Sequence, residues 1–190
     1  MKTITLEEIA NLARGVHADP AALMAVIRVE GSGKGYDHLT GKILIQFEPY
    51  HFNRYTGVRV ANGVENQAHE WTAFNEAFKL NKEAAMLSTS WGMMQVMGFN
   101  HVASGFKTVG EMIDSFKASE LNQVKGALNF IKSSPQLLKA LQLKDWAGFA
   151  CGYNGKFYRK FNYDARLKEA FEESKALFYV RLLKVEDLIK

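Results

Sequence analysis

Hydrophobic residues recur along most of this chain at the spacing of an amphipathic helix, and helix-capping signals bracket several of these segments. Thr5 and Thr108 each open a capping box with a glutamate three residues later, and Asp19 precedes a proline suited to a first helical turn. One segment, Ile43–Phe47, has the pattern of a short strand and predicts a small hairpin or three-stranded patch. The fold class is therefore predicted to be mainly α, an α+β arrangement with helices over about 5–14, 20–30, 66–80, 86–97, 108–117, 120–133, 135–142, 145–151 and 164–188.

The segment from Ala21 to Val29 is apolar on almost every side, with Arg28 as the exception, which predicts a helix buried all round. It ends in Glu30, which a glycine-rich turn follows. A carboxylate at a helix C-terminus opposes the macrodipole at a cost of a few tenths to ~1 kcal/mol. Such a broken local rule is expected at functional sites. Glu30 is therefore a candidate catalytic acid, and the alternative is a surface ion pair with Arg28 or a lysine.

Two further segments combine apolar periodicity with unusual residues. The helix predicted over 86–97 contains Gly92, which costs ~1 kcal/mol relative to alanine and suggests that another backbone or a ligand approaches closely. The helix over 66–80 places Trp71, Phe74 and Phe78 on one face. We interpret this aromatic stripe as core packing rather than as a platform for a sugar.

Composition limits the domain organisation. The 190 residues are 47% hydrophobic and include three prolines, and no linker-like stretch divides them, so one globular domain over residues 1–190 is predicted. Glu7 and Glu8 stand where a signal peptide needs an apolar run, and no apolar run reaches the ~18–20 residues of a membrane span. We therefore expect the protein to be made in the cytoplasm.

Charge and cysteine content exclude several kinds of site. The net charge of +4 and the pI near 9.1 favour a polyanionic partner, such as nucleic acid, anionic lipid or peptidoglycan, but the basic residues form no block. The single cysteine, Cys151, cannot form an intrachain disulfide, and we expect it to be a small buried side chain. The five histidines lack zinc-binding spacing, so neither a metal nor a cofactor is expected.

Cleavage of a glycosidic bond needs a protonated carboxyl group with a raised pKa, and Glu30 at the end of an apolar helix suits that role. A second carboxylate usually lies ~5–5.5 Å away in retaining enzymes or ~6.5–9.5 Å away in inverting enzymes. Asp37 and Glu48 are the candidates that follow Glu30 in the chain.

Three motifs occur in a characteristic order after Glu30: Phe-Glu-x-x-x-Phe at 47–52, Ser-Trp-Gly-x-x-Gln-x-Met-Gly-Phe-Asn at 90–100, and Tyr-Asn-Gly at 153–155. In this order they resemble the phage-endolysin N-acetylmuramidase family of the lysozyme superfamily, which is similar to goose-type lysozymes and soluble lytic transglycosylases. The resemblance covers about residues 16–175. It implies a lysozyme-like fold in which a small β region flanks the cleft. Many members of the family also carry a separate wall-binding module, for which this chain has no room.

The resemblance also implies roles for individual residues. Glu30 resembles the general acid, and Glu48 resembles a cleft residue that helps to position water or the acid. The substrate-binding residues implied or considered are Ser90, Gln95, Tyr153, Asn154 and Asp37; of these, Tyr153 and Asn154 resemble the pair that faces the catalytic glutamate. The sequence departs from the family after Asn154, where it reads Gly-Lys-Phe-Tyr instead of Gly-Pro-Gly-Tyr. This departure affects the expected shape of the loop.

The leading hypothesis is a phage-type endolysin that hydrolyses the β-1,4 bond between N-acetylmuramic acid and N-acetylglucosamine and so lyses bacteria. We expect a monomer that waits in the host cytoplasm for a membrane-permeabilising partner. One alternative is a lytic transglycosylase, which forms 1,6-anhydro products with the same glutamate. Another is a non-catalytic module that binds the wall or nucleic acid, although nucleic-acid-binding motifs are missing. The basic, amphipathic segment Ser174–Lys184 either contacts an anionic membrane or docks on the core, and we favour docking.

Overall fold

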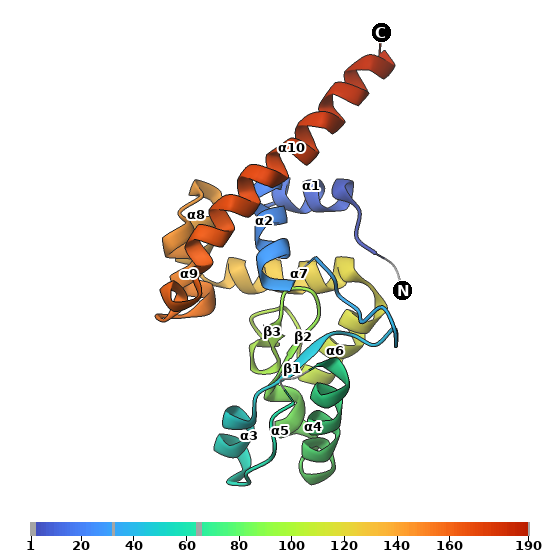
Figure 1. The fold of residues 1–190 in the computed structure, drawn as a ribbon, viewed down its shortest axis with the longest axis vertical. Coiled ribbons are helices and arrows are strands. Elements are labelled where there is room, and N and C mark those ends of the chain that lie inside the picture. Colours follow the sequence, from blue (N-terminus) through green and yellow to red (C-terminus); the bar gives the residue numbers. More distant parts are fainter. Residues whose placement is uncertain (1–2, 32, 64–65, 190) are drawn as a thin grey trace. The chain divides into compact units, whose positions relative to one another are not determined.

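The computed structural model describes residues 3–31, 33–63 and 66–189, and it describes side chains as far as residue 178 (Figure 1). The chain divides into two compact units. We call Ile4–Gly33 with Ser134–Lys190 the helical unit, because its elements are all helices. We call Met1–Thr3 with Lys34–Ser133 the mixed unit, because it contains the strands.

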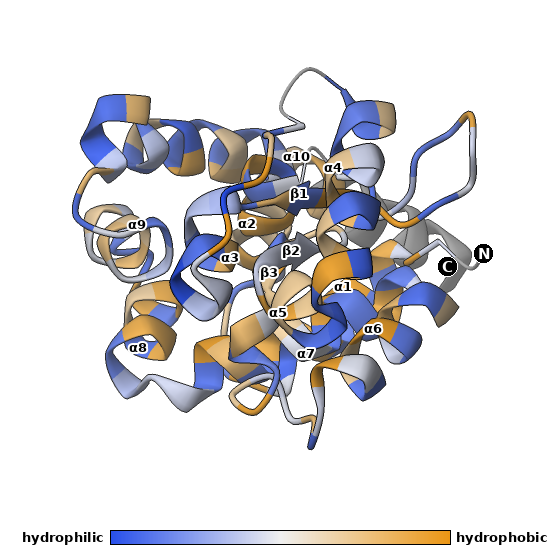
Figure 2. Ribbon diagram, turned by 90° about the horizontal axis from the view of Figure 1, so that it is seen from below, coloured by the Kyte–Doolittle hydropathy of each residue, from blue (hydrophilic) through white to orange (hydrophobic). Residues whose placement is uncertain are grey.

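The helical unit is built around the apolar helix that the sequence predicts. Its elements are α1 (Leu6–Arg14), α2 (Pro20–Gly31), α8 (Pro135–Leu143), α9 (Trp146–Asn154), the 3-10 helix η2 (Tyr158–Phe161) and α10 (Tyr163–Ile189). Helix α2 packs against α1, α8 and α10, and its ribbon is mostly the orange of hydrophobic residues in Figure 2. Leu23, Ala25 and Val26 are fully buried there, so the prediction of a helix buried all round is confirmed.

Local capping explains why the helices of this unit begin where the sequence predicts. Thr5 accepts a hydrogen bond from the Glu8 N–H, and the Glu8 carboxylate accepts one from the Thr5 N–H, so the first capping box is confirmed. Asp19 accepts a hydrogen bond from the Ala21 N–H at 2.9 Å and thereby caps α2. These bonds satisfy N–H groups that have no partner inside the helix.

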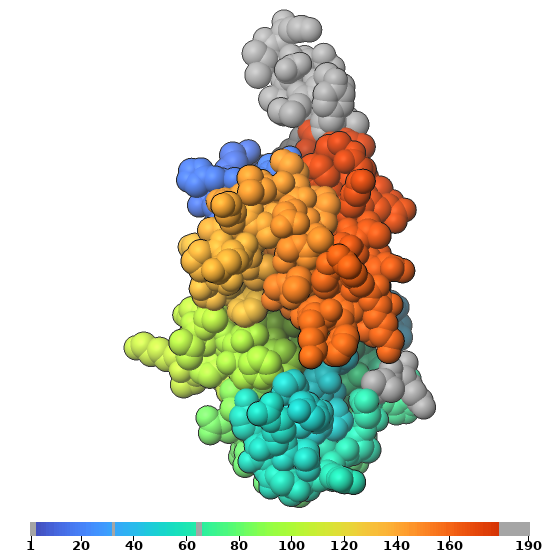
Figure 3. Space-filling model, turned by 90° about the vertical axis from the view of Figure 1, so that its left-hand side faces the viewer, coloured from blue at the N-terminus to red at the C-terminus, as the bar shows by residue number. Residues whose placement is uncertain are grey.

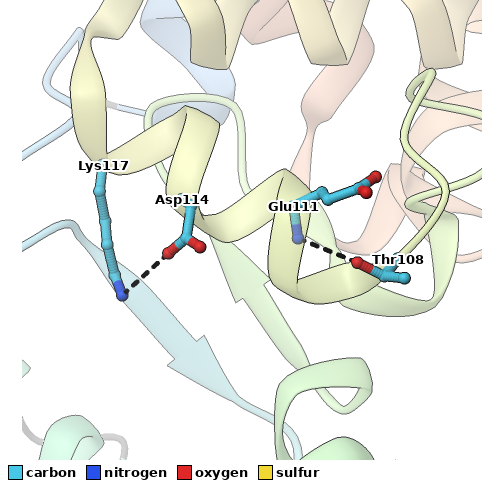
Figure 4. Close-up of polar contacts among 4 residues, drawn as sticks. All are labelled: Thr108, Glu111, Asp114 and Lys117. Carbon is cyan, nitrogen blue, oxygen red and sulfur yellow. Dashed lines mark hydrogen bonds and ion pairs between the residues drawn. The ribbon is translucent and has the colours of Figure 1, made fainter.

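The mixed unit combines helices with one small sheet. Its elements are β1 (Ile45–Phe47), α3 (Pro49–Thr56), α4 (Gln67–Leu80), α5 (Lys82–Leu87), β2 (Thr89–Trp91), β3 (Val96–Met97), the 3-10 helix η1 (Gly98–Asn100), α6 (Val109–Ala118) and α7 (Glu120–Ser133). The second predicted capping box begins α6: Thr108 accepts from the Glu111 N–H at 3.1 Å (Figure 4). The Glu111 carboxylate accepts from the Lys107 N–H, so this half of the box lies one residue earlier than predicted.

The sheet is antiparallel and has the order β1-β2-β3. The helix predicted over 86–97 is therefore wrong: α5 ends at Leu87, and Thr89–Met97 forms the hairpin of β2 and β3. The turn of this hairpin contains two residues in the left-handed region, Gly92 with a φ of 73° and Gln95 with a φ of 48°. Apolar side chains on both sides of this segment are buried, so its pattern resembled that of a buried helix.

A close approach does occur at Gly92, but a side chain makes it instead of the backbone or ligand that the sequence suggested. A Cβ atom there would lie 2.7 Å from the side chain of Gln123, which is itself buried. Gln123 accepts a hydrogen bond from the Met93 N–H and donates one to the Phe116 carbonyl. The turn and α7 are therefore joined at a position where only glycine fits.

Helix α4 covers the free edge of β1. The Gln67 amide donates to the Ile45 carbonyl and accepts from the Ile45 N–H, and the buried Glu70 carboxylate accepts from the Phe47 N–H at 2.8 Å. Of the aromatic stripe of this helix, Phe74 is buried and packs edge-on to both Trp71 and Trp91, whereas Trp71 and Phe78 are half-buried. These bonds satisfy backbone groups that an edge strand otherwise leaves unpaired.

Three expectations concern features outside the sheet. Cys151 is exposed on α9, which corrects the prediction of a buried cysteine, because α9 buries its neighbours Phe149 and Ala150 instead. Helix α10 packs on α2 and α9, but most side chains of the segment Ser174–Lys184 lie outside the described residues. No helix in the described part of the chain has both the length and the apolar character that a membrane span requires.

Candidate functional site

Glu30 lies in the last turn of α2, where the helix continues for one more residue to Gly31. The side-chain amide of Asn154, the last residue of α9, donates to both carboxylate oxygens of Glu30, at 3.1 Å to Oε1 and 3.0 Å to Oε2. Arg28 instead forms an ion pair with Glu173 at 2.7 Å. The alternative in which Arg28 pairs with Glu30 is therefore wrong.

Burial controls the protonation of Glu30. Desolvation raises the pKa of its carboxyl group from 4.5 to about 7, although the Asn154 hydrogen bond and the positive charge of Arg166 both lower it. Arg166 is held nearby, because it donates to the Val29 carbonyl at 3.3 Å. A carboxyl group with this pKa is largely protonated in mildly acidic solution and can donate a proton close to neutral pH.

Tyr153 also belongs to the surroundings of Glu30. Its ring stacks on Phe149 within α9, with 5.4 Å between ring centroids. Burial and the negative charge of Glu30 raise the pKa of the Tyr153 hydroxyl well above its ordinary value, so this hydroxyl stays neutral. The helical unit thus brings Glu30, Tyr153 and Asn154 together from α2 and α9.

The loop after Asn154, where the sequence departs from the family pattern, connects α9 to η2. Gly155 has a φ of 83° and ends α9, and Tyr158 then begins η2 with its side chain buried. The departure from the family pattern therefore leaves a compact connection, and Asn154 keeps its position on Glu30.

A second polar group lies in the mixed unit, and we call Gln46, Glu48, Ser90 and Gln95 the Glu48 cluster. The Gln46 amide donates to the Glu48 carboxylate at 3.0 Å, and the Ser90 hydroxyl donates to the Gln95 side-chain oxygen at 2.7 Å. Gln46 and Ser90 are paired across β1 and β2, and the Ser90 hydroxyl also lies 3.4 Å from the Gln46 carbonyl. The pairing of Gln46 with Ser90 in the sheet therefore links the Gln46–Glu48 and Ser90–Gln95 hydrogen bonds.

The carboxyl group of Glu48 is half-buried and close to a second acid. Its pKa is raised by burial and by the charge of Glu70, and lowered by the hydrogen bond from Gln46. Burial also raises the pKa of Glu70. Sequence reasoning missed Glu70, although the residue occupies a buried position of α4 with Ala73, Phe74 and Ala77. A carboxylate at the apolar spacing of a helix was the signal that could have identified it.

Asp37 occupies a different place. Its carboxylate accepts hydrogen bonds from the N–H groups of Leu39 and Thr40 and from the Thr40 hydroxyl, and these bonds lower its pKa. Asp37 thus shapes the turn before β1, and its hydrogen bonds go to residues of that turn and not to the Glu48 cluster. Within the described residues, no group of three or more histidine, cysteine, aspartate or glutamate side chains could hold a metal ion.

Comparisons with known proteins identify the family and the fold. The model of a family described as N-acetylmuramidase matches residues 19–175, which include Glu30, the Glu48 cluster and Asn154. The fold is similar to that in a crystal structure of a Burkholderia AP3 phage endolysin, with a TM-score of 0.82 and 30% sequence identity over 92% of this chain and 73% of that chain. No curated protein matches the chain. The lysozyme-like α+β fold and the family resemblance inferred from the sequence are therefore confirmed.

Proposed function

Because the chain belongs to the N-acetylmuramidase family, we propose that it hydrolyses the β-1,4 bond between N-acetylmuramic acid and N-acetylglucosamine in bacterial peptidoglycan. The observation that carries the proposal is Glu30, a partly buried carboxyl group whose pKa is raised to about 7 and which Asn154 holds by both oxygens. Similarity to a phage endolysin supports a role in lysis of the host.

In this proposal Glu30 is the general acid. Its protonated carboxyl group donates a proton to the glycosidic oxygen while the C–O bond breaks and positive charge develops on the sugar. Asn154 fixes the direction of the carboxyl group, and the neutral Tyr153 hydroxyl adds no second negative charge beside it. Water then adds to the anomeric carbon, supplies the new hydroxyl group and gives its second proton to a carboxylate, which leaves a neutral sugar.

We assign Glu48 the role of second carboxylate, which stabilises the charged sugar or activates the attacking water. Gln46 holds the Glu48 side chain. The buried Ser90 hydroxyl donates to Gln95, whose amide donates to the Gly92 carbonyl, so we assign this pair the role of shaping the sugar-binding surface beside Glu48. The proposal treats the two units as one catalytic domain. Asp37, Tyr153 and Asn154 remain proposed contacts of the substrate.

The cellular setting is part of the proposal. Basic net charge suits an anionic cell wall and an anionic membrane surface, and neither a nucleic acid nor a cofactor is needed. We place the protein as a monomer in the host cytoplasm until a membrane-permeabilising partner gives it access to the wall.

A lytic transglycosylase is the second candidate, favoured by the fact that Glu30 and its partners form a complete group without another carboxylate. In that reaction the 6-hydroxyl group of the muramic acid replaces water and closes a 1,6-anhydro ring. Glu30 then acts first as acid and afterwards as base.

The test is digestion of purified peptidoglycan followed by mass spectrometry of the fragments, with Glu30→Gln as the matched control. Hydrolysis predicts reducing N-acetylmuramic acid ends. Anhydro ends, lighter by one water, would establish the transglycosylase instead. Reducing N-acetylglucosamine ends would place the cleavage at the other glycosidic bond, and a folded protein that releases no fragments would refute the proposal.

A further inference from the structure

We propose that the pocket lined by His51, Arg54, Tyr55 and Phe99 binds the acidic stem peptide that is attached to muramic acid in peptidoglycan. We call it the α3 pocket. The inference rests on the proposed function and adds a specificity to it: the enzyme prefers glycan that carries peptides over glycan without them. Arg54 is the residue that recognises a peptide carboxylate.

The α3 pocket is a small, open hollow of about 300 Å³ in the mixed unit, formed by three residues of α3 and by Phe99 of η1. The cyan segment that contains α3 lies on the face turned to the viewer in Figure 3. The His51 ring contacts Phe99, with 5.1 Å between centroids, and Tyr50, with 5.4 Å. These rings give the pocket fixed walls.

The aromatic side chains of this region are unusually exposed. Tyr50 is 68% exposed, Tyr55 is 51% exposed and Phe99 is 38% exposed. Scattered apolar residues are normal on a surface, but Tyr55 and Phe99 both line one hollow and Tyr50 contacts its His51 wall, which together indicate a contact surface. Tyrosine in particular offers apolar area and a hydroxyl group together, which suits a ligand that is partly polar.

The charge of the pocket points to an anionic ligand. The Arg54 guanidinium lies 5.9 Å from the centre of the Tyr50 ring, and among the described residues no acidic side chain pairs with it. No acidic side chain among the residues that the structure describes lines the pocket. Burial and the neighbouring Arg54 charge lower the pKa of His51, so the imidazole is neutral at neutral pH. An arginine fork of this kind matches the geometry of a carboxylate.

The position of the pocket in the sequence favours a group attached to the substrate. Helix α3 begins directly after Glu48, and the Glu48 carbonyl accepts a hydrogen bond from the His51 N–H at 3.0 Å. Arg54 follows Glu48 by six residues, which corresponds to ~9 Å along a helix at its usual rise. A sugar placed at Glu48 would therefore bring its attached peptide within reach of Arg54.

A second cavity in the mixed unit provides a matched comparison. It measures about 370 Å³ and lies between the turn at Asp37 and the first turns of α4. Lys42 lies over the Trp71 ring there, at 5.3 Å from the centroid. This cavity also has a cation and an aromatic ring, but an acidic residue, Asp37, lines it as well. It is therefore less suited to an anion than the α3 pocket.

The experiment compares two substrates made from one peptidoglycan preparation, one with its stem peptides and one from which an amidase has removed them. For each enzyme we would measure kcat/KM from released reducing ends and take the ratio between the two substrates. Arg54→Gln should lower this preference for peptide-bearing glycan about threefold to tenfold, the range of an exposed to partly desolvated charged hydrogen bond. Lys42→Gln should keep the wild-type ratio, and Arg54→Lys should restore part of it.

Three results would contradict the inference. A wild-type enzyme without preference for peptide-bearing glycan would overturn it, and so would an unchanged ratio in Arg54→Gln. An equal fall of the ratio in Lys42→Gln would show a general effect of charge instead of a pocket. Failure of the proposed function looks different, because the wild-type enzyme would then cleave neither substrate, and both proposals would fall together.

Discussion

The two units of this protein each hold a carboxyl group with a raised pKa, but the neighbouring groups that act on that pKa differ between the units. In the helical unit, burial is the dominant cause at Glu30, and an amide and a guanidinium group partly offset it. In the mixed unit, burial at Glu48 is reinforced by a second carboxylate, that of Glu70. Glu30 therefore has partners that stabilise its anion after proton transfer, whereas Glu48 has a neighbour that repels its anion. Such different environments are how one fold assigns different roles to two acids.

The largest expected effect tests the helical unit. Glu30→Gln keeps the shape and the buried position but removes the proton, so we expect cleavage of peptidoglycan to fall about 10³-fold or more, in line with the usual worth of general acid catalysis. Turbidity loss of cell-wall suspensions measures the rate, and circular dichroism checks the fold. A folded variant with retained activity would remove Glu30 from its role.

The next largest effect tests how the mixed unit is held together. In Gly92→Ala, an alanine must adopt the left-handed φ of Gly92, and its Cβ atom would lie 2.7 Å from Gln123. Because both effects are unfavourable, we expect a loss of about 3 kcal/mol in unfolding free energy. Gly57→Ala is the matched control, since its φ of 74° is equally strained but no atom lies within 4 Å of the added methyl group. It should cost about 1 kcal/mol. Equal losses in urea denaturation would show that contact with Gln123 is unimportant.

The raised pKa of Glu30 also predicts a pH-dependent stability. The folded protein favours the protonated carboxyl group, so this contribution is complete below a pH of about 4.5 and is lost as the pH rises through about 7. A permanently neutral Glu30→Gln variant should therefore be more stable than the wild type at pH 8, by about 2–3 kcal/mol. At pH 4 the two should be similar. Equal unfolding free energies at pH 8 would contradict the pKa of Glu30.

Glu48→Gln tests whether the mixed unit supplies a second catalytic group. We expect a loss of about tenfold to a hundredfold in kcat with the fold intact, smaller than the effect at Glu30. Asp37→Asn tests the other candidate carboxylate: because that carboxylate is engaged in its own turn, the activity should fall by no more than about threefold. Full activity in both variants would favour the transglycosylase, which needs Glu30 alone.

The smallest effect concerns the partner of Glu30. Asn154→Leu keeps the site buried but removes a hydrogen bond that lowers the pKa of Glu30, so that pKa should rise. Because the protonated acid is the active form, the alkaline limb of the pH profile of kcat/KM should move to higher pH. Cys151→Ser, on the exposed side of the same helix, should leave the profile unchanged. A shift to lower pH would contradict the role given to Asn154.

The sequence alone predicted most of the helices and singled out Glu30 as the candidate acid, because both inferences depend on local signals. Capping residues such as Thr5 and Asp19 and the apolar repeat of α2 act within one or two turns, and Glu30 stands out against that repeat. The order of the three motifs after Glu30 identified the family, although no single motif was sufficient to do so.

Only the tertiary structure decided what depends on distant residues. The hairpin at Thr89–Met97 resembled a helix in sequence, because both of its faces are buried and its register comes from pairing with Ile45–Phe47, more than 40 residues earlier. The bond from Asn154 to Glu30 crosses 124 residues. The structural role of Glu70 likewise depends on a distant residue, because its carboxylate accepts a hydrogen bond from the Phe47 N–H, 23 residues away. Local propensity cannot encode such pairings, since they form only when packing brings the partners together and removes water from both.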